Sequence, residues 1–340
     1  MSDLPLLAIH GAGNIGLYVG GRLRQHTPVR FLGRPSLKAA IQAEGLALSD
    51  SSGWSHRWAG QALDFQTDPA ALAEASLILV CVKSAATAQA AGELAAFARP
   101  GSVIISLQNG LENAARLQAA LPSHTVLAGM VPFNVVSRAP GVLHQASGGT
   151  LMIADHPARA AWQDLFDQAG LPVQWRHDMP SVLRAKLLFN LNNAINALSD
   201  LPLREQLSQR AWRRCLAVVQ REALAAFATA RLPVARLTPL PPRWLPHALE
   251  LPDSLFAHLA PRMLAIDPLA RSSTWEDLRA GRTTEVDALQ GAVVRLAQSQ
   301  GLEAAANMRL MTLLRDAECG VSRTWTAQAL LDELKRAGSI

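Results

Sequence analysis

The sequence has few cysteines and no long apolar run. Cys81, Cys215 and Cys319 are odd in number and far apart, which excludes a disulfide framework and a cysteine metal cluster and predicts three buried thiols. The longest apolar run near the start, residues 77–82, has six residues and is far too short to span a bilayer. Residues 1–6 lack the basic and apolar regions of a signal peptide. We therefore expect a soluble cytoplasmic protein with no membrane partner.

A basic stripe is also missing, although the formal net charge is +5 and the pI is near 9.6. The arginines are spread along the chain and do not alternate with aromatic residues, which argues against nucleic acid as a partner. A mildly basic protein suits an anionic cofactor and an anionic small-molecule substrate instead. The 340 residues, 49% of them hydrophobic, are enough for two cores, so the length predicts two domains.

The most informative pattern is a G-x-G-x-x-G turn directly after an apolar, strand-like run. Gly11 permits the tight turn, and Gly13 lets phosphates approach the backbone. Gly16 lets a helix, expected over residues 15–25, pack on the strand with its free N–H groups facing the phosphates. A second expected strand, residues 29–32, supplies the βαβ context that favours a dinucleotide site over a purely structural turn. The predicted cofactor turn consists of Gly11, Ala12, Gly13, Asn14, Ile15 and Gly16.

The end of the second strand indicates which dinucleotide binds. An NAD site usually has an acid here to hold the ribose 2′-hydroxyl, but no acid occurs between Leu32 and Glu44. Arg34 can grip a 2′-phosphate bidentately, with Ser36 and Lys38 as nearby polar or cationic help. The alternative is a solvated loop arginine. We predict NADP (NADPH) as the cofactor rather than NAD.

Strand-like and helical runs alternate through the first half of the chain, which predicts an α/β fold with a Rossmann-type doubly wound sheet. The expected strands are residues 6–9, 29–32, 77–82, 103–106 and 126–129, with 151–154 closing the sheet. Lys83 and Asn109 follow two of these strands. Ligands gather at the carboxyl ends of such strands, so both residues are expected near the nicotinamide or its ribose.

From about residue 179 the pattern becomes helical, so we place the domain boundary near Asp178. Residues 1–178 are expected to bind NADP, and residues 179–340 to form an all-helical domain for substrate binding and dimerisation. The expected helices are 181–198, 205–231, 274–279, 284–300, 308–318 and 327–337. Residues 233–252 contain six prolines and predict a stiff loop rather than regular helix. The sequence does not fix the oligomeric state; a homodimer is compatible with this organisation.

The helix expected over residues 181–198 has a polar face. Lys186, Asn190 and Asn193 lie at i, i+4 and i+7 and so share one side of an otherwise apolar helix. A lysine and two amides are costly to bury without partners. They suit a cleft that receives a small polar substrate; the alternative is a solvated stripe at a domain edge.

A second constellation lies almost a hundred residues later. A short helix capped by Ser273 is expected to end at Gly281, and a new helix is expected to begin at Thr283 or Thr284. Glu285 would then lie in a first helical turn. It is either an acid that stabilises the helix dipole or a ligand for substrate, and the residues alone leave both open.

Together these segments resemble the ketopantoate reductase family, the NADPH-dependent 2-dehydropantoate 2-reductases, along nearly the whole chain. The resemblance rests on the order and spacing of GAGNIG at 11–16, CVK at 81–83, LQNG at 107–110, KLLFN at 186–190, SS at 272–273 with Asp277, and TEVD at 284–287. It implies an N-terminal Rossmann domain, a helical C-terminal domain, an active cleft between them and no metal.

The resemblance also implies a role for each matching residue. Lys186 matches the catalytic lysine, which would act as general acid, and Glu285 matches the substrate-binding glutamate. The implied substrate-binding residues are Asn109, Asn190, Asn193, Ser273 and Glu285. The implied cofactor-binding residues beyond the glycine turn are Arg34, Lys83, Asn109 and Glu285.

Two positions depart from the family pattern. The second helix asparagine usually stands eight residues after the lysine, where this chain has Ala194, so Asn193 or Asn196 must substitute or the contact is missing. Ala270 stands where the family often has asparagine. These departures leave the choice of 2-oxo acid open.

The expected reaction is the NADPH-dependent reduction of 2-dehydropantoate to pantoate, a step of pantothenate and coenzyme A biosynthesis. One alternative is a family relative that reduces another 2-oxo acid or an imine. Another is a non-catalytic protein that senses NADP. The presence of both Lys186 and Glu285 speaks against the sensor, because binding alone needs neither.

Overall fold

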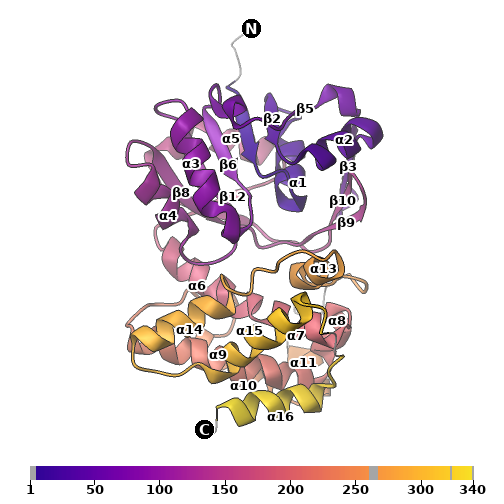
Figure 1. Ribbon diagram of the computed structural model, residues 1–340, viewed down its shortest axis with the longest axis vertical. Helices are drawn as coiled ribbons and strands as arrows, with labels where there is room; N and C mark the ends of the chain where they lie inside the picture. Colours follow the sequence, from indigo (N-terminus) through magenta and orange to yellow (C-terminus); the bar gives the residue numbers. More distant parts are fainter. Residues whose placement is uncertain (1–4, 260–266, 322–323, 339–340) are drawn as a thin grey trace. The chain divides into compact units, whose positions relative to one another are not determined.

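The structure is a computed structural model that describes residues 5–259, 267–321 and 324–338. Residues 1–4 of the opening segment, in which no signal peptide is predicted, lie outside the described residues. The chain forms two compact units, Met1–Met179 and Pro180–Ile340. In Figure 1 the first unit runs from indigo to magenta and holds the strands, and the second ends in the yellow helix α16.

The first unit is built on an eight-stranded sheet with the order β12-β11-β8-β7-β6-β1-β2-β5. Its strands are β1 Leu7–His10, β2 Val29–Leu32, β5 Asp64–Gln66, β6 Leu77–Val80, β7 Val103–Ser106, β8 Thr125–Met130, β11 Leu151–Ala154 and β12 Val173–Arg176. The six neighbouring strands β8, β7, β6, β1, β2 and β5 all pair in parallel, whereas β11 runs antiparallel to β8. This confirms the predicted Rossmann-type class, with two strands of opposite direction, β11 and β12, added at one edge.

Helices cover both faces of this sheet. They are α1 Asn14–Leu23, α2 Pro35–Glu44, α3 Thr87–Phe97, α4 Asn113–Ala120 and α5 Gln163–Gln168. Side chains alternate along a strand, so β1 contributes to two separate cores. Ile9 packs in one cluster with Leu17 of α1, whereas Ala8 packs in the other with Leu94 of α3. All four of these side chains are at most 3% exposed.

A second, four-stranded sheet was not predicted. Its order is β4-β3-β10-β9, with β3 Leu46–Asp50, β4 Ser55–Trp58, β9 Val135–Ala139 and β10 Val142–Gln145. These strands are rich in serine, histidine and arginine, which hides the strand signal. A buried arginine attaches this sheet to α1: Arg22 donates to the Asp50 carboxylate at 3.0 Å and to the Ala169 carbonyl oxygen at 2.9 Å.

The described part of the second unit contains helices and no strand. The helices are α6 Met179–Asn190, α7 Asn192–Ser199, α8 Leu203–Ser208, α9 Arg210–Thr229, α10 Leu245–Leu249, α11 Asp253–Leu259, α13 Ser273–Arg279, α14 Gln290–Ser299, α15 Ala305–Glu318 and α16 Ala327–Ala337. The helical class is therefore confirmed. Two expected helices are each divided, at Leu191 and at Gln209.

The prediction for residues 233–252 is wrong in its second half. A short 3₁₀ turn, Pro242–Trp244, leads into α10, and Pro246 occupies the first turn of that helix. A proline is tolerated there because its missing N–H would have had no intrahelical partner. Leu245 and Leu249 are buried, so this segment packs as an amphipathic turn of helix.

The prediction of three buried thiols is also wrong for one of them. Cys215 is buried and Cys81 half-buried, and burial raises the pKa of each thiol to about 12. Cys319 is exposed, because α15 ends at Glu318 and the chain turns at the surface there.

Candidate active site

The glycine turn after β1 is shaped by two positions that exclude a side chain. Gly11 has a φ of +100°, and a Cβ there would lie 2.6 Å from the backbone nitrogen of Val82. A Cβ on Gly16 would lie 2.3 Å from the Gly11 carbonyl oxygen. Both glycines are therefore required by the fold itself, whether or not a ligand binds.

Gly13 differs from its neighbours because the space beside it is open. A Cβ built on Gly13 would meet no heavy atom within 4 Å. Gly13 is also the N-cap of α1, and no side chain caps that helix end. Backbone N–H groups at an uncapped helix start, beside open space, fit a pyrophosphate.

The other three residues of the turn are tied to the surrounding fold. The Ala12 backbone N–H donates to the Leu32 carbonyl oxygen at 3.0 Å, and the Asn14 side chain donates to the Val135 carbonyl oxygen at 3.2 Å. Ile15 packs against the core of the first unit. Their side chains support the turn from the protein side.

Arg34 lies at the carboxyl end of β2 and is exposed. It is the N-cap of α2, which starts at Pro35, so Ser36 and Lys38 fall in the first turn of that helix. Within the described residues, no hydrogen bond or ion pair engages the Arg34 side chain. The guanidinium is thus a cation available to an anionic ligand.

Lys83 and Asn109 follow neighbouring strands, β6 and β7, and both are half-buried. The strand order turns at β1, which lies between β2 and β6, and ligands of such sheets bind at the carboxyl edge of this switch point. The two loops are joined directly, since Ser84 Oγ donates to the Asn109 carbonyl oxygen at 2.8 Å. The structure therefore brings these two predicted residues together.

Lys186 lies on α6 and is half-buried. Burial disfavours the ammonium form and lowers the pKa of Lys186 to about 8. Within the described ranges of the chain, no carboxylate pairs with it. A lysine whose pKa lies this close to neutrality can exchange a proton at physiological pH, which suits acid–base chemistry.

Two of the four asparagines in this region have structural roles. Asn192 exchanges two amide hydrogen bonds with Gln206, each at 3.0 Å. Asn196 is fully buried; its Nδ2 donates to the Leu201 carbonyl oxygen and its Oδ1 accepts from the Ser272 N–H, both at 2.9 Å. Asn196 is thus fully engaged within the protein. Asn190 is buried and lies one turn after Lys186 on α6, whereas Asn193 is half-buried and lies on α7, so the polar face predicted for one helix is divided between two.

The predicted cap of α13 is off by one residue. Ser272 is the N-cap: its Oγ accepts from the Trp275 N–H at 3.2 Å and donates to the Asn193 carbonyl oxygen at 3.1 Å. Ser273 is instead the first helical residue, and it is exposed. The capping role therefore belongs to Ser272, which leaves the Ser273 hydroxyl at the surface.

The structure contradicts the interpretation of Glu285 as a first-turn acid. α14 begins at Gln290, and Glu285 lies in the preceding turn. Just before Glu285, the Thr284 N–H donates to the Glu318 carboxylate of α15 at 2.7 Å. A dipole contribution to α14 thus does not explain this half-buried carboxylate.

The segments that carry the predicted residues of the second unit meet around the junction of α6 and α7. Gln290, at the start of α14, donates to the Leu191 carbonyl oxygen at 3.0 Å. The start of α13 is held by Asn196, as described above. Ser272 belongs to the SS motif at 272–273, although its role as the cap was not predicted, and Gln290 was not predicted because a polar core residue of this kind carries no motif.

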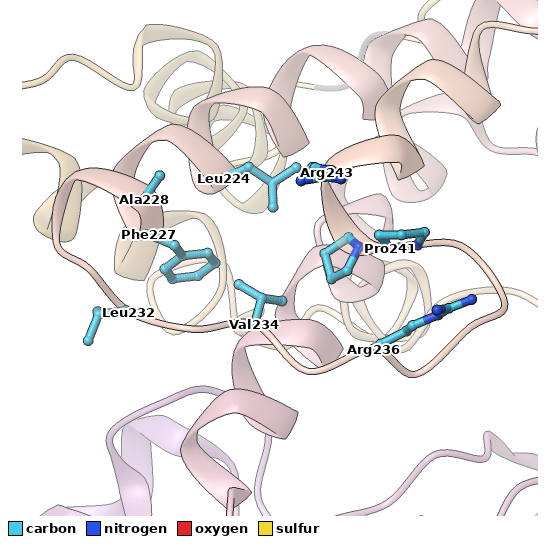
Figure 2. A pocket seen from close by; sticks show the side chains of 9 residues that line it. Leu224, Phe227, Ala228, Leu232, Val234, Arg236, Pro241 and Arg243 are labelled. Atoms are coloured by element: carbon cyan, nitrogen blue, oxygen red, sulfur yellow. The ribbon is translucent and has the colours of Figure 1, made fainter.

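The two cavities characterised in the structure lie away from these residues. One, of about 530 Å³, lies between the carboxyl half of α9 and the segment 232–243 that follows it (Figure 2). It is lined by Leu224, Phe227, Ala228, Leu232, Val234, Arg236, Pro241, Pro242 and Arg243. The other, of about 440 Å³, lies on β3, β4 and β10. No cluster of three metal-ligating side chains occurs among the described residues, and no described helix is long and apolar enough to cross a membrane.

A Rossmann-type sheet with a glycine turn after its first strand, followed by a helical unit, is typical of oxidoreductases that use a nicotinamide dinucleotide. The particular family follows from comparison with known proteins. The chain belongs to the ketopantoate reductase family: the family described as "Ketopantoate reductase PanE/ApbA" matches residues 7–158, and its C-terminal counterpart matches residues 178–318.

Individual relatives agree with this assignment. A 2-dehydropantoate 2-reductase of Halobacterium salinarum is 28% identical over 92% of this chain and 98% of its own length. The crystal structure of a PanE/ApbA family ketopantoate reductase from Ralstonia eutropha superposes with a TM-score of 0.78, at 29% identity, covering 94% of this chain and all of that one. D-mandelate dehydrogenase bound to NADH shares the fold at 17% identity, with a TM-score of 0.76 over 94% of this chain and all of that one.

Proposed function

We propose that this protein reduces 2-dehydropantoate to pantoate with NADPH. The observation that carries the proposal is Lys186, a half-buried lysine with a lowered pKa, one helical turn before Asn190 on α6. The family match and the 2-dehydropantoate 2-reductases among the relatives support the substrate.

The cofactor, when bound, supplies the hydride that reduces the keto carbon. Lys186 donates the proton to the carbonyl oxygen of the substrate as negative charge develops there. An ammonium with a pKa of about 8 is largely protonated at neutral pH and yet gives up its proton readily. Reduction of a 2-oxo acid then yields a 2-hydroxy acid.

The remaining polar residues orient the substrate. Glu285 accepts a hydrogen bond from the distal hydroxyl, and the Ser273 hydroxyl and the Asn190 amide bind the polar ends. Of the two asparagines that can replace the family's second helix asparagine, we assign Asn193, because both polar atoms of the Asn196 side chain are engaged within the protein. Ala194 is only 1% exposed and points into the core.

The proposed cofactor-binding residues contact different parts of the dinucleotide. The open space at Gly13 and the uncapped start of α1 receive the pyrophosphate, and Lys83 and Asn109 lie at the nicotinamide end. Arg34 binds the 2′-phosphate. The chain offers no acid between Leu32 and Glu44 for a free 2′-hydroxyl, which favours NADPH over the NADH seen with D-mandelate dehydrogenase.

Arg34→Ala is expected to weaken NADPH binding about 10- to 100-fold while leaving NADH binding nearly unchanged, because one bidentate, charge-assisted contact is lost only for the phosphorylated cofactor. Both affinities are measured by titrating nicotinamide fluorescence. The control is Arg99→Ala, which removes an exposed arginine from the amino-terminal edge of the sheet, before β7. Equal losses for the two cofactors would refute this role for Arg34.

The activity is tested with purified protein by following NADPH consumption with 2-dehydropantoate beside a panel of other 2-oxo acids and imines. We expect the highest kcat/KM with 2-dehydropantoate. A higher value with another compound reassigns the substrate within the family. Tight NADPH binding without turnover of any compound would point to the sensor instead.

A further inference from the structure

Polar side chains from the end of β7 and from the segments that lead from β6 into α3 and from β7 into α4 form one continuous set of hydrogen bonds, which we call the buried polar chain: Ser84, Thr87, Ser106, Gln108 and Asn113. Ser106 Oγ donates to Gln108 Oε1 at 3.0 Å, and Gln108 Nε2 donates to Thr87 Oγ1 at 2.8 Å. Thr87 Oγ1 in turn donates to Asn113 Oδ1 at 2.9 Å.

The buried polar chain ends on the backbone of a predicted site residue. Asn113 Nδ2 donates to Ser84 Oγ at 3.0 Å and also to the carbonyl oxygen of Asn109. Ser84 Oγ donates to the same carbonyl oxygen at 2.8 Å. Two donors from different segments therefore hold one oxygen atom in place.

The arrangement is rigid because its members are buried and mutually satisfied. Thr87, Ser106, Gln108 and Asn113 are each at most 7% exposed. The Thr87 hydroxyl accepts one bond and donates one, so its loss takes a partner from both Gln108 Nε2 and Asn113 Oδ1. Hydrogen bonds linked in this way polarise and strengthen one another.

The buried polar chain connects the loops that follow β6 and β7. Ser84 begins the 3₁₀ turn directly after Lys83, and Thr87 is the first residue of α3. Gln108 directly precedes Asn109 in the loop after β7, and Asn113 is the first residue of α4. The buried polar chain therefore fastens one cofactor loop to the other.

We propose that the buried polar chain is the positioning device of the site: it fixes the Asn109 loop against the Lys83 loop, so that the two residues meet cofactor and substrate as a single unit. Thr87 and Asn113 are its central positioning residues. The proposal rests on the proposed function only for the roles of Lys83 and Asn109.

The test compares two substitutions at one position. Thr87→Val keeps the shape of the side chain but removes the hydroxyl, whereas Thr87→Ser keeps the hydroxyl. We expect Thr87→Val to weaken NADPH binding and to lower kcat/KM about 10- to 100-fold, mainly through KM, because small displacements of binding groups have effects of this size. Thr87→Ser should stay within about threefold of the wild type for both quantities.

A control separates positioning from general loss of stability. Ser102→Ala removes another buried hydroxyl, 1% exposed and bonded to the Arg99 carbonyl oxygen, at the opposite end of β7. It should lower the melting temperature without changing NADPH affinity. If Thr87→Val does not fold, Ser84→Ala replaces it: this residue is only half-buried, and its loss should weaken NADPH binding in the same direction but less.

Coupling between the loops gives the decisive measurement. In a Lys83→Ala variant the loop after β6 has already lost the contact between the Lys83 side chain and NADPH. Adding Thr87→Val to this variant should therefore reduce NADPH affinity much less than it does in the wild type. Equal costs in the two backgrounds, or a Thr87→Val variant that behaves like Ser102→Ala, would overturn the proposal. NADPH affinity is measured without substrate, so a failure to reduce 2-dehydropantoate would refute the proposed function and leave this test intact.

Discussion

Lys186→Ala is expected to lower kcat on the order of 10²- to 10⁴-fold, because the variant has no group to protonate the carbonyl oxygen as the hydride arrives. NADPH affinity should be nearly unchanged. The measurement is kcat with NADPH and 2-dehydropantoate at neutral pH. Lys335→Ala is the control, since it removes an exposed lysine from the last turn of α16. Near-normal turnover in Lys186→Ala would show that the proton comes from elsewhere.

The pH dependence of the wild-type enzyme reports the same residue. Burial holds the pKa of Lys186 at about 8, so below this pH the ammonium is present and can donate its proton. The rate of reduction should therefore be flat below about pH 8 and fall about tenfold per pH unit above it. Oxidation of the 2-hydroxy acid needs the free amine and should rise through the same pH. Profiles that do not change in opposite directions near this pH would exclude Lys186 as the titrating group.

Glu285→Ala is expected to abolish most of the preference for the hydroxylated substrate. A site built to bond a substrate hydroxyl discriminates against the analogue without it, on the order of 10⁴-fold in kcat/KM, because the binding group is left unpaired. The variant should lose activity on 2-dehydropantoate far more than on the analogue in which hydrogen replaces the distal hydroxyl. The ratio of the two kcat/KM values, in wild type and variant, is the measured quantity.

A neighbouring acid provides the control for Glu285. Asp287 lies two residues further on, is exposed and pairs with Arg315, so Asp287→Ala tests the loss of a carboxylate from the same turn. It should leave the preference between the two substrates unchanged. An unchanged preference in Glu285→Ala as well would remove Glu285 from the site, together with the main argument for 2-dehydropantoate over other 2-oxo acids.

The central strands of the large sheet were predictable because they are buried and mostly apolar, as in β6, whereas the edge strands β5 and β12 are short and polar and were not predicted. The glycine turn was predictable because a backbone constraint at Gly11 leaves a visible signature in the sequence. The four-stranded sheet was not predictable. Its strands carry polar residues, as in Ser55–Trp58, and β3 pairs with β10 from a distant part of the chain, so neither periodicity nor composition identifies them.

The candidate residues of the second unit show where such reasoning stops. A first-turn acid and an acid in the turn before a helix look alike in sequence, and only the observed start of α14 at Gln290 separates them for Glu285. Asn193 and Asn196 are likewise equivalent in sequence, and only the structure shows that Asn196 accepts a hydrogen bond from Ser272 in a distant segment. Long-range contacts of this kind decide the role of a residue without leaving a local pattern.

The uneven exposure of the three cysteines has a practical consequence for biophysical work. Alkylating reagents attack the thiolate, and with a pKa of about 12 the thiols of Cys81 and Cys215 form almost none at neutral pH. Cys319 is the exposed thiol. A maleimide dye should therefore attach to the unaltered protein at this single position, just beyond α15, and provide a fluorescent label for ligand titrations without any engineered cysteine.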